Sequence, residues 1–125
     1  MDSEFRPLYI RERELIEKLL EVDFPGRDEL RIQLNSLRAK QILEDGTLRL
    51  QCNSGPPAPT KYRLVTEGTC KDADGMTIAV LLHVGTDRLM SMLEILKYDE
   101  TPIINPPSAC DLVASSVPSF WASDH

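Results

Sequence analysis

The sequence predicts an α+β fold in which two N-terminal helices are followed by a four- to five-stranded antiparallel sheet. Apolar residues recur at helical spacing in the first part of the chain, whereas after Ala39 they fall in short segments separated by turn sequences. The chain has 125 residues, of which 42% are hydrophobic, so it is long enough for one domain with its own core. Helices and strands that are segregated along the chain are typical of the α+β class.

The first helix is expected over Arg11–Val22. Its apolar residues recur at i, i+1, i+4 and i+5 and therefore share one face: Leu15, Ile16, Leu19 and Leu20. Pro25 disfavours helix at the preceding residue, and Gly26 permits a turn. The helix therefore ends before these two residues.

The second helix is expected from Asp28 to about Leu37. Asp28 is a good N-cap residue, because its carboxylate can accept the free N–H groups of the first turn. Leu30, Leu34 and Leu37 follow at i, i+4 and i+7, so this helix also has one apolar face. The short connection predicts that the two helices pack as a hairpin or corner.

The strands follow from alternating apolar residues and from turns that contain glycine, such as Glu44–Gly46. The central strand should be Thr77–Val84, because it is apolar on both faces. Four more segments are expected to pair around it: Ala39–Leu43, Thr47–Cys52, Tyr62–Cys70 and Arg88–Tyr98.

The predicted single domain covers residues 1–125, with its core over about 6–113. Pro106, Pro107 and Pro118 predict that the chain after the last strand is mostly irregular, with Leu112 and Val113 docking on the domain. Residues 1–5 and 114–125 are therefore expected to be irregular tails.

Charge and hydropathy exclude several classes of protein. The formal net charge is −6 and both halves of the chain are acidic, so no clustered basic stripe is present for nucleic acid. The longest apolar run, Ile78–Leu82, is far too short to span a membrane. The first residues are rich in charge, unlike a secretory signal. These features predict a cytoplasmic protein.

The cysteines and the known motifs indicate no metal or cofactor. Cys52, Cys70 and Cys110 form no CxxC pair, and their odd number predicts reduced thiols. In the Asp72–Gly75 segment, an EF-hand reading would put Cys70 and Leu81 at positions that require carboxylates. A hairpin turn is therefore the favoured interpretation of that segment. The nucleotide-binding and hydrolase motifs are also missing.

His83 is the one histidine placed where it could act in catalysis. With a hairpin centred on Thr86–Asp87, His83 should face Met90, and Glu94 should face Ala79, so His83 and Glu94 would not be direct neighbours. A hydrogen-bonded structural histidine is the expectation. The alternative is a small enzyme or small-molecule sensor with a pocket around His83, Glu94 and Tyr98.

A non-enzymatic binding module is the favoured functional class, because no catalytic set is visible and the chain is small and acidic. Acidic surfaces speed association with basic partners, so the most concrete version is an immunity-type protein that binds a basic protein. Acidic residues in the turns and strands would provide the contacts: Glu67, Asp72, Asp74, Asp87, Asp99 and Glu100.

Several short segments, taken together, resemble a family of small bacterial proteins that carries only a domain-of-unknown-function label. The most specific are Phe24-Pro-Gly-Arg-Asp-Glu-Leu30 and Leu81-Leu-His-Val84, and the resemblance extends over residues 5–113. It implies a bacterial, single-domain, cytoplasmic protein and supplies no catalytic residues. The family has a Thr, often followed by Pro, where Tyr9 and Ile10 stand, so the start of the first helix should differ here.

Overall fold

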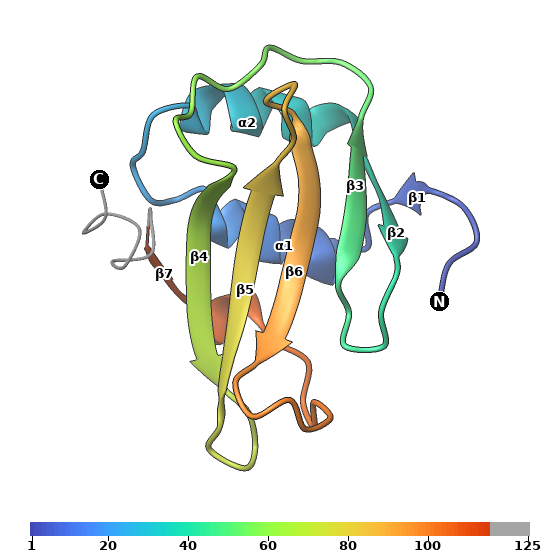
Figure 1. The fold of residues 1–125 in the computed structure, drawn as a ribbon, viewed down its shortest axis with the longest axis vertical. Helices are drawn as coiled ribbons and strands as arrows, with labels where there is room; N and C mark the ends of the chain where they lie inside the picture. Colours follow the sequence, from blue (N-terminus) through green and yellow to red (C-terminus); the bar gives the residue numbers. More distant parts are fainter. Residues whose placement is uncertain (116–125) are drawn as a thin grey trace.

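The computed structural model describes residues 1–115 and forms them into an α+β fold. Its sheet has seven strands in the order β1-β2-β3-β6-β5-β4-β7, and every neighbouring pair is antiparallel (Figure 1). The strands are β1 (Arg6–Pro7), β2 (Leu37–Gln41), β3 (Leu48–Cys52), β4 (Leu64–Lys71), β5 (Thr77–Val84), β6 (Met90–Lys97) and β7 (Val113–Ser115).

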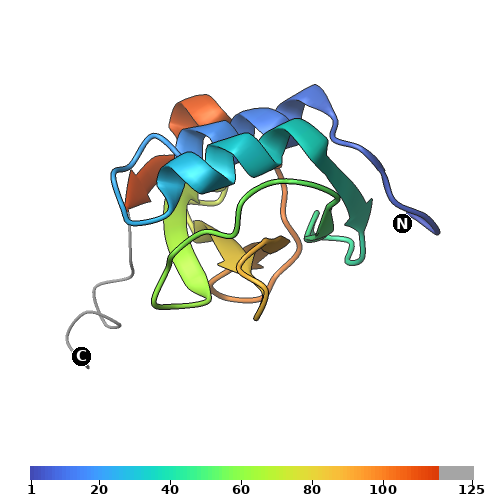
Figure 2. The ribbon, with the colours of Figure 1, turned by 90° about the horizontal axis from the view of Figure 1, so that it is seen from above.

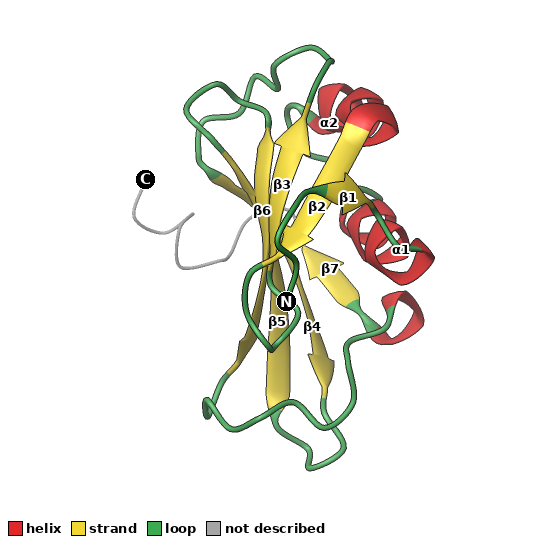
Figure 3. Ribbon diagram, turned by 90° about the vertical axis from the view of Figure 1, so that its right-hand side faces the viewer, coloured by secondary structure: helices red, strands yellow, loops and turns green. Residues whose placement is uncertain are grey.

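Two short helices cover one face of this sheet, as Figures 2 and 3 show. They are α1 (Ile10–Leu19) and α2 (Arg27–Gln33), and a 3₁₀ turn at Leu34–Ser36 leads from α2 into β2. The apolar face predicted for the first helix is buried, with Ile16 and Leu19 fully excluded from solvent. The core lies between the helices and the sheet face that carries Ile78, Val80 and Leu82.

The five predicted strands are all present, Thr77–Val84 with the predicted ends and the other four with shifted ends, and β1 and β7 add one strand at each edge. The prediction of four to five strands was therefore too low. These edge strands have only two and three residues, which is too short for a pattern of alternation to be recognised.

The predicted N-cap of the second helix was wrong. Gly26, with φ +96°, occupies the N-cap position, and Asp28 lies inside the first turn. A Cβ atom at Gly26 would lie 2.8 Å from Cγ2 of Thr60, so this glycine also permits a close approach of the Ala58–Thr60 segment. Glycine tolerates a positive φ because it has no Cβ to clash with the backbone.

The start of α1 is held by Glu12 in place of a threonine cap. Glu12 is buried, and its carboxylate accepts the Tyr9 N–H at 2.9 Å. The Arg6 guanidinium binds the same carboxylate through two hydrogen bonds of 2.8 and 2.9 Å. The resemblance left the start of this helix open, and the structure has it at Ile10.

The predicted irregular tail from residue 114 was partly wrong, because Ala114 and Ser115 belong to β7 and pair with β4. Residues 116–125 of that predicted tail lie outside the described part. Leu112 docks on the sheet as expected, since a Cβ at Gly68 would lie 2.6 Å from Cγ of Leu112. Val113 is 73% exposed and does not share in this packing.

The register of the β5–β6 hairpin also differs from the prediction. A bulge between His83 and Val84 shifts the pairing, so that His83 faces Met92 and Glu94 faces Leu81. A bulge adds one residue to one strand and moves the following side chains relative to the partner. His83 and Glu94 are thereby brought closer than a bulge-free hairpin would place them.

The three cysteines are free, with Cys110 exposed and the other two partly buried. Burial, followed by the charges of Asp111 and Asp72, raises the pKa of the Cys70 thiol. Neither helix in the described part is long and apolar enough to cross a membrane.

Candidate functional site

His83 and Glu94 are in direct contact on the sheet face that the helices leave uncovered. Nε2 of His83 and Oε1 of Glu94 are 3.0 Å apart, and the two side chains are 22% and 36% exposed. The two residues lie on adjacent strands in diagonal positions of the same face. The prediction that they are not direct neighbours was therefore wrong: the turn displaces the register by one position, since Val84 pairs with Met90, and the bulge displaces it by one more.

Tyr98 does not join this pair. Its N–H bonds to the Thr77 carbonyl at the opposite end of the β5–β6 hairpin. Tyr98 follows β6 and lies six positions after Met92, the residue opposite His83, which is about 20 Å along an extended strand. The three residues of the alternative pocket therefore do not line one cavity.

The Asp72–Gly75 segment is a hairpin turn, as predicted, and its acidic residues bind a lysine. The Lys97 ammonium lies 2.9 Å from Oδ2 of Asp72 and 2.7 Å from Oδ2 of Asp74. The Lys97 and Asp72 side chains are 2% and 0% exposed, whereas Asp74 is 38% exposed. Asp72 thus has no free surface to offer a partner.

The Asp72 carboxylate is further satisfied by backbone groups. It accepts the N–H groups of Ile104 and Asn105 at 2.9 Å and that of Ala73 at 2.7 Å. The Ile104 N–H above all, with Lys97 and the other two N–H groups, holds the pKa of Asp72 far below its usual range, although burial opposes this. Hydrogen bonds to the ionised form always favour that form.

The pKa values of Lys97 and Asp74 are also shifted, each in the direction that favours the charged form. The hydrogen bond from Lys97 and then the Met76 N–H lower the pKa of Asp74. Asp74 and Asp72 together raise the pKa of Lys97 against the effect of burial. The Asp72–Gly75 turn, which connects β4 to β5, is therefore held to the loop after β6 by these charged contacts.

The other predicted contact residues are spread over the molecule. Glu67 lies in the middle of β4, where burial raises its pKa, and Asp87 lies in the β5–β6 turn and accepts the Leu89 N–H. Asp99 and Glu100 follow β6 at the opposite end of the sheet from Asp87. The predicted acidic contact set does not form one surface.

A different acidic group gathers around a hollow of about 590 Å³ at the end of β6. Glu44 and Asp45, from the β2–β3 turn, line it together with Glu100. Its apolar lining includes Leu96, which is 41% exposed, and Ile103. Within residues 1–115, the lining has one basic residue, Lys97, which is already bound to Asp72 and Asp74. The lining therefore combines apolar side chains with three carboxylates that form no ion pair within residues 1–115.

Sequence reasoning placed Glu44 and Asp45 in a turn and assigned them no further role. They lie near Glu100 because β3 pairs with β6, which brings the β2–β3 turn to the end of β6. That strand order could not be read from the sequence. The signal that was available is a pair of adjacent acidic residues in each of the two segments.

No group of three or more His, Cys, Asp or Glu side chains suitable for a metal ion occurs within residues 1–115. The carboxylates of the Asp72–Gly75 turn are bound to Lys97 and backbone N–H groups, which agrees with that finding.

Comparison with known proteins gives one match. A family model described as a domain of unknown function, DUF6984, matches residues 5–107. No curated protein and no solved structure matches the chain.

Proposed function

Because the chain belongs to the DUF6984 family, a domain of unknown function, its role must be argued from its own residues, and we propose that it is a non-enzymatic binding module for a basic protein partner. The acidic hollow at the end of β6 carries this proposal. The most concrete version of the proposal is an immunity-type protein in the bacterial cytoplasm, whose partner is a basic toxin.

The composition of the hollow supports such a partner. Glu44, Asp45 and Glu100 supply negative charge in its lining, and Leu96 and Ile103 supply apolar area. Interfaces commonly combine an apolar centre with a polar rim, and charge complementarity raises the rate of association. A segment that carries Lys or Arg next to an apolar side chain would satisfy both features.

The probe for this surface is a fluorescein-labelled peptide of alternating Lys and Leu, with a Glu–Leu peptide for comparison. We expect the basic peptide to bind and the acidic one not to bind, as measured by fluorescence anisotropy. Affinity should fall between about 0.05 M and about 0.3 M salt, because exposed charges are screened over a shorter distance at higher ionic strength.

The decisive comparison uses two double variants with the same change in net charge. Glu44→Lys/Glu100→Lys reverses two charges at the hollow and should abolish binding. Glu14→Lys/Asp23→Lys reverses two exposed charges on the helical side of the molecule, and neither side chain forms a hydrogen bond or ion pair within residues 1–115. Equal loss in both variants would show attraction to overall charge only and would contradict the proposed site.

The immunity-type version of the proposal makes one further prediction. A gene encoding a basic toxin should lie beside the gene for this chain, and the purified toxin should bind the wild type but not the Glu44→Lys/Glu100→Lys variant. A toxin that bound both equally would place the interface elsewhere.

A further inference from the structure

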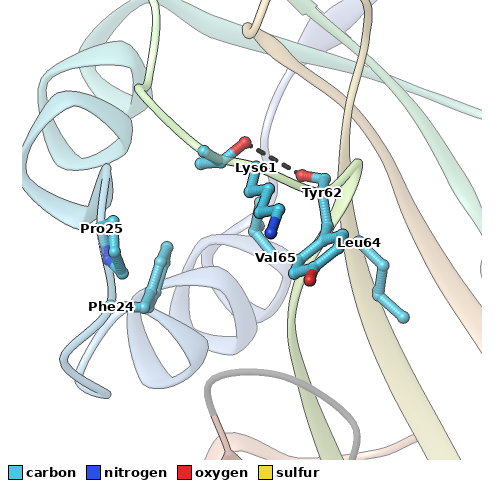
Figure 4. Close-up of a pocket in the computed structure, with 7 residues that line it drawn as sticks. Phe24, Pro25, Lys61, Tyr62, Leu64 and Val65 are labelled. Carbon is cyan, nitrogen blue, oxygen red and sulfur yellow. Dashed lines mark hydrogen bonds between the residues drawn. The ribbon is translucent and has the colours of Figure 1, made fainter. Parts of the chain in front are cut away.

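A second hollow, at the other end of the sheet, is almost entirely apolar. Phe24 and Pro25 form one side of it, and Tyr62, Leu64 and Val65 form the other (Figure 4). Its volume is about 250 Å³. Phe24 and Pro25 belong to the α1–α2 connection, and the opposite wall belongs to the segment that enters β4. This hollow is independent of the acidic hollow at the end of β6.

The walls of this apolar hollow are fixed by contacts on both sides. The Thr60 hydroxyl donates to the Tyr62 carbonyl at 2.9 Å, and the Ala58 N–H donates to the Arg88 carbonyl at 3.0 Å. Gly26 lies so close to Thr60 that a Cβ atom would not fit between them. The hollow is therefore formed before any ligand arrives, which reduces the entropy lost on binding.

Among the described residues that line the hollow, Lys61 alone is charged. Figure 4 shows its side chain reaching into the space between Phe24 and Tyr62. Its ammonium lies 5.7 Å from the centre of the Tyr62 ring, and it forms no ion pair within residues 1–115. The chain has 20 acidic and 14 basic residues, yet the part that the structure describes lines this hollow with one cation and no carboxylate.

We propose that this apolar hollow binds a small monoanion with an apolar body, such as an arylalkyl carboxylate, whose charge meets Lys61. The volume lies below the range of roughly 300–1,000 Å³ usual for drug-sized ligands. One ring with a short side chain fits that size, and a nucleotide does not. The apolar body would displace water from Pro25, which is exposed, and Leu64, which is half-buried, and the carboxylate would lie beside the ammonium.

The test uses 4-phenylbutyrate as the probe and 4-phenylbutanol as its uncharged analogue, titrated into the full chain and followed by ¹H–¹⁵N correlation spectra. We expect shifts centred on the amides of Phe24, Tyr62 and Val65. The alcohol should bind about five-fold more weakly, because a partly exposed ion pair contributes up to about 1 kcal/mol, which is that factor in affinity.

Two lysine variants separate the proposed contact from overall charge. Lys61→Met keeps most of the apolar stem and removes the ammonium, and it should weaken 4-phenylbutyrate about five-fold while leaving the alcohol unchanged. Lys71→Met removes an exposed charge at the far end of β4 and should change neither affinity. Absent shifts in the full chain would overturn the proposal. An alcohol that binds as tightly as the acid would overturn the role of Lys61.

Discussion

The ammonium of Lys97 lies 2.9 Å from the carboxylate of Asp72, and both side chains are closed off from solvent. The pair joins the last residue of β6 to the turn between β4 and β5. The Pro102 carbonyl also accepts a hydrogen bond from Lys97, and the Ile104 N–H donates to Asp72. The pair thereby fixes the loop that supplies Glu100 to the acidic hollow.

The first prediction concerns acid stability. The pKa of Asp72 is lowered in the folded chain, so its carboxylate adds stability above its unfolded pKa of about 3.9, and this contribution is lost as pH falls toward the folded pKa. The urea midpoint should therefore fall steeply between about pH 4 and about pH 2. In Asp72→Asn the midpoint should be lower at neutral pH and depend less on pH over that interval. A variant as acid-sensitive as the wild type would assign the loss to other carboxylates.

The second prediction concerns Gln33, which is completely buried. Its amide nitrogen donates to the carbonyls of Pro56 and Arg88 at 2.8 and 3.1 Å, and its amide oxygen accepts the Met90 N–H at 2.9 Å. Gln33→Leu leaves the Pro56 carbonyl and the Met90 N–H without this partner, while the Arg88 carbonyl keeps the Ala58 N–H, and it should cost on the order of 2–4 kcal/mol in the free energy of unfolding. Urea denaturation measures this, and Gln51→Leu, at an exposed position of β3, should cost less than about 0.5 kcal/mol.

The third prediction compares two glycines with similar backbone conformations. Gly26 and Gly75 have φ of +96° and +84°, but a Cβ would lie 2.8 Å from Thr60 at Gly26 and would meet nothing within 4 Å at Gly75. Gly75→Ala should therefore cost about 1 kcal/mol from the backbone alone. Gly26→Ala should cost about 2–4 kcal/mol, since overpacking is added. Equal costs in thermal or urea unfolding would mean that the Ala58–Thr60 segment moves aside freely.

How far the sequence predicts this fold depends on the length of each pattern. Thr77–Val84 was predicted with the bounds that the structure shows, because eight residues of apolar character between two turns specify a strand. β1 and β7 are too short to carry such a signal. The helix start at Arg27 was missed because the N-cap is a glycine chosen for its φ and its contact with Thr60, and neither property is visible in local sequence.

The candidate sites were less predictable than the fold, for a topological reason. Glu44 and Glu100 line the same hollow only because β3 lies beside β6. Phe24 and Tyr62 line the other hollow only because the segment before β4 returns to the α1–α2 connection. Both are long-range relationships that hydrophobic periodicity does not encode. The acidic character of the chain was visible, but Asp72 shows that an acidic residue in a turn can be buried by a lysine 25 residues away in the chain.

The last prediction concerns His83 and Glu94, whose contact depends on the bulge in the β5–β6 hairpin. Both side chains are partly exposed on the uncovered face, so their interaction is worth far less than a buried ion pair. In a double-mutant cycle of His83→Ala, Glu94→Ala and the double variant, we expect a coupling free energy of about 0.2–1 kcal/mol at low salt. The coupling should shrink at about 1 M salt, because screening weakens exposed charge pairs most. A coupling above about 2 kcal/mol that does not respond to salt would mean that the ring is held in a desolvated network, as the prediction of a structural histidine within the sheet had supposed.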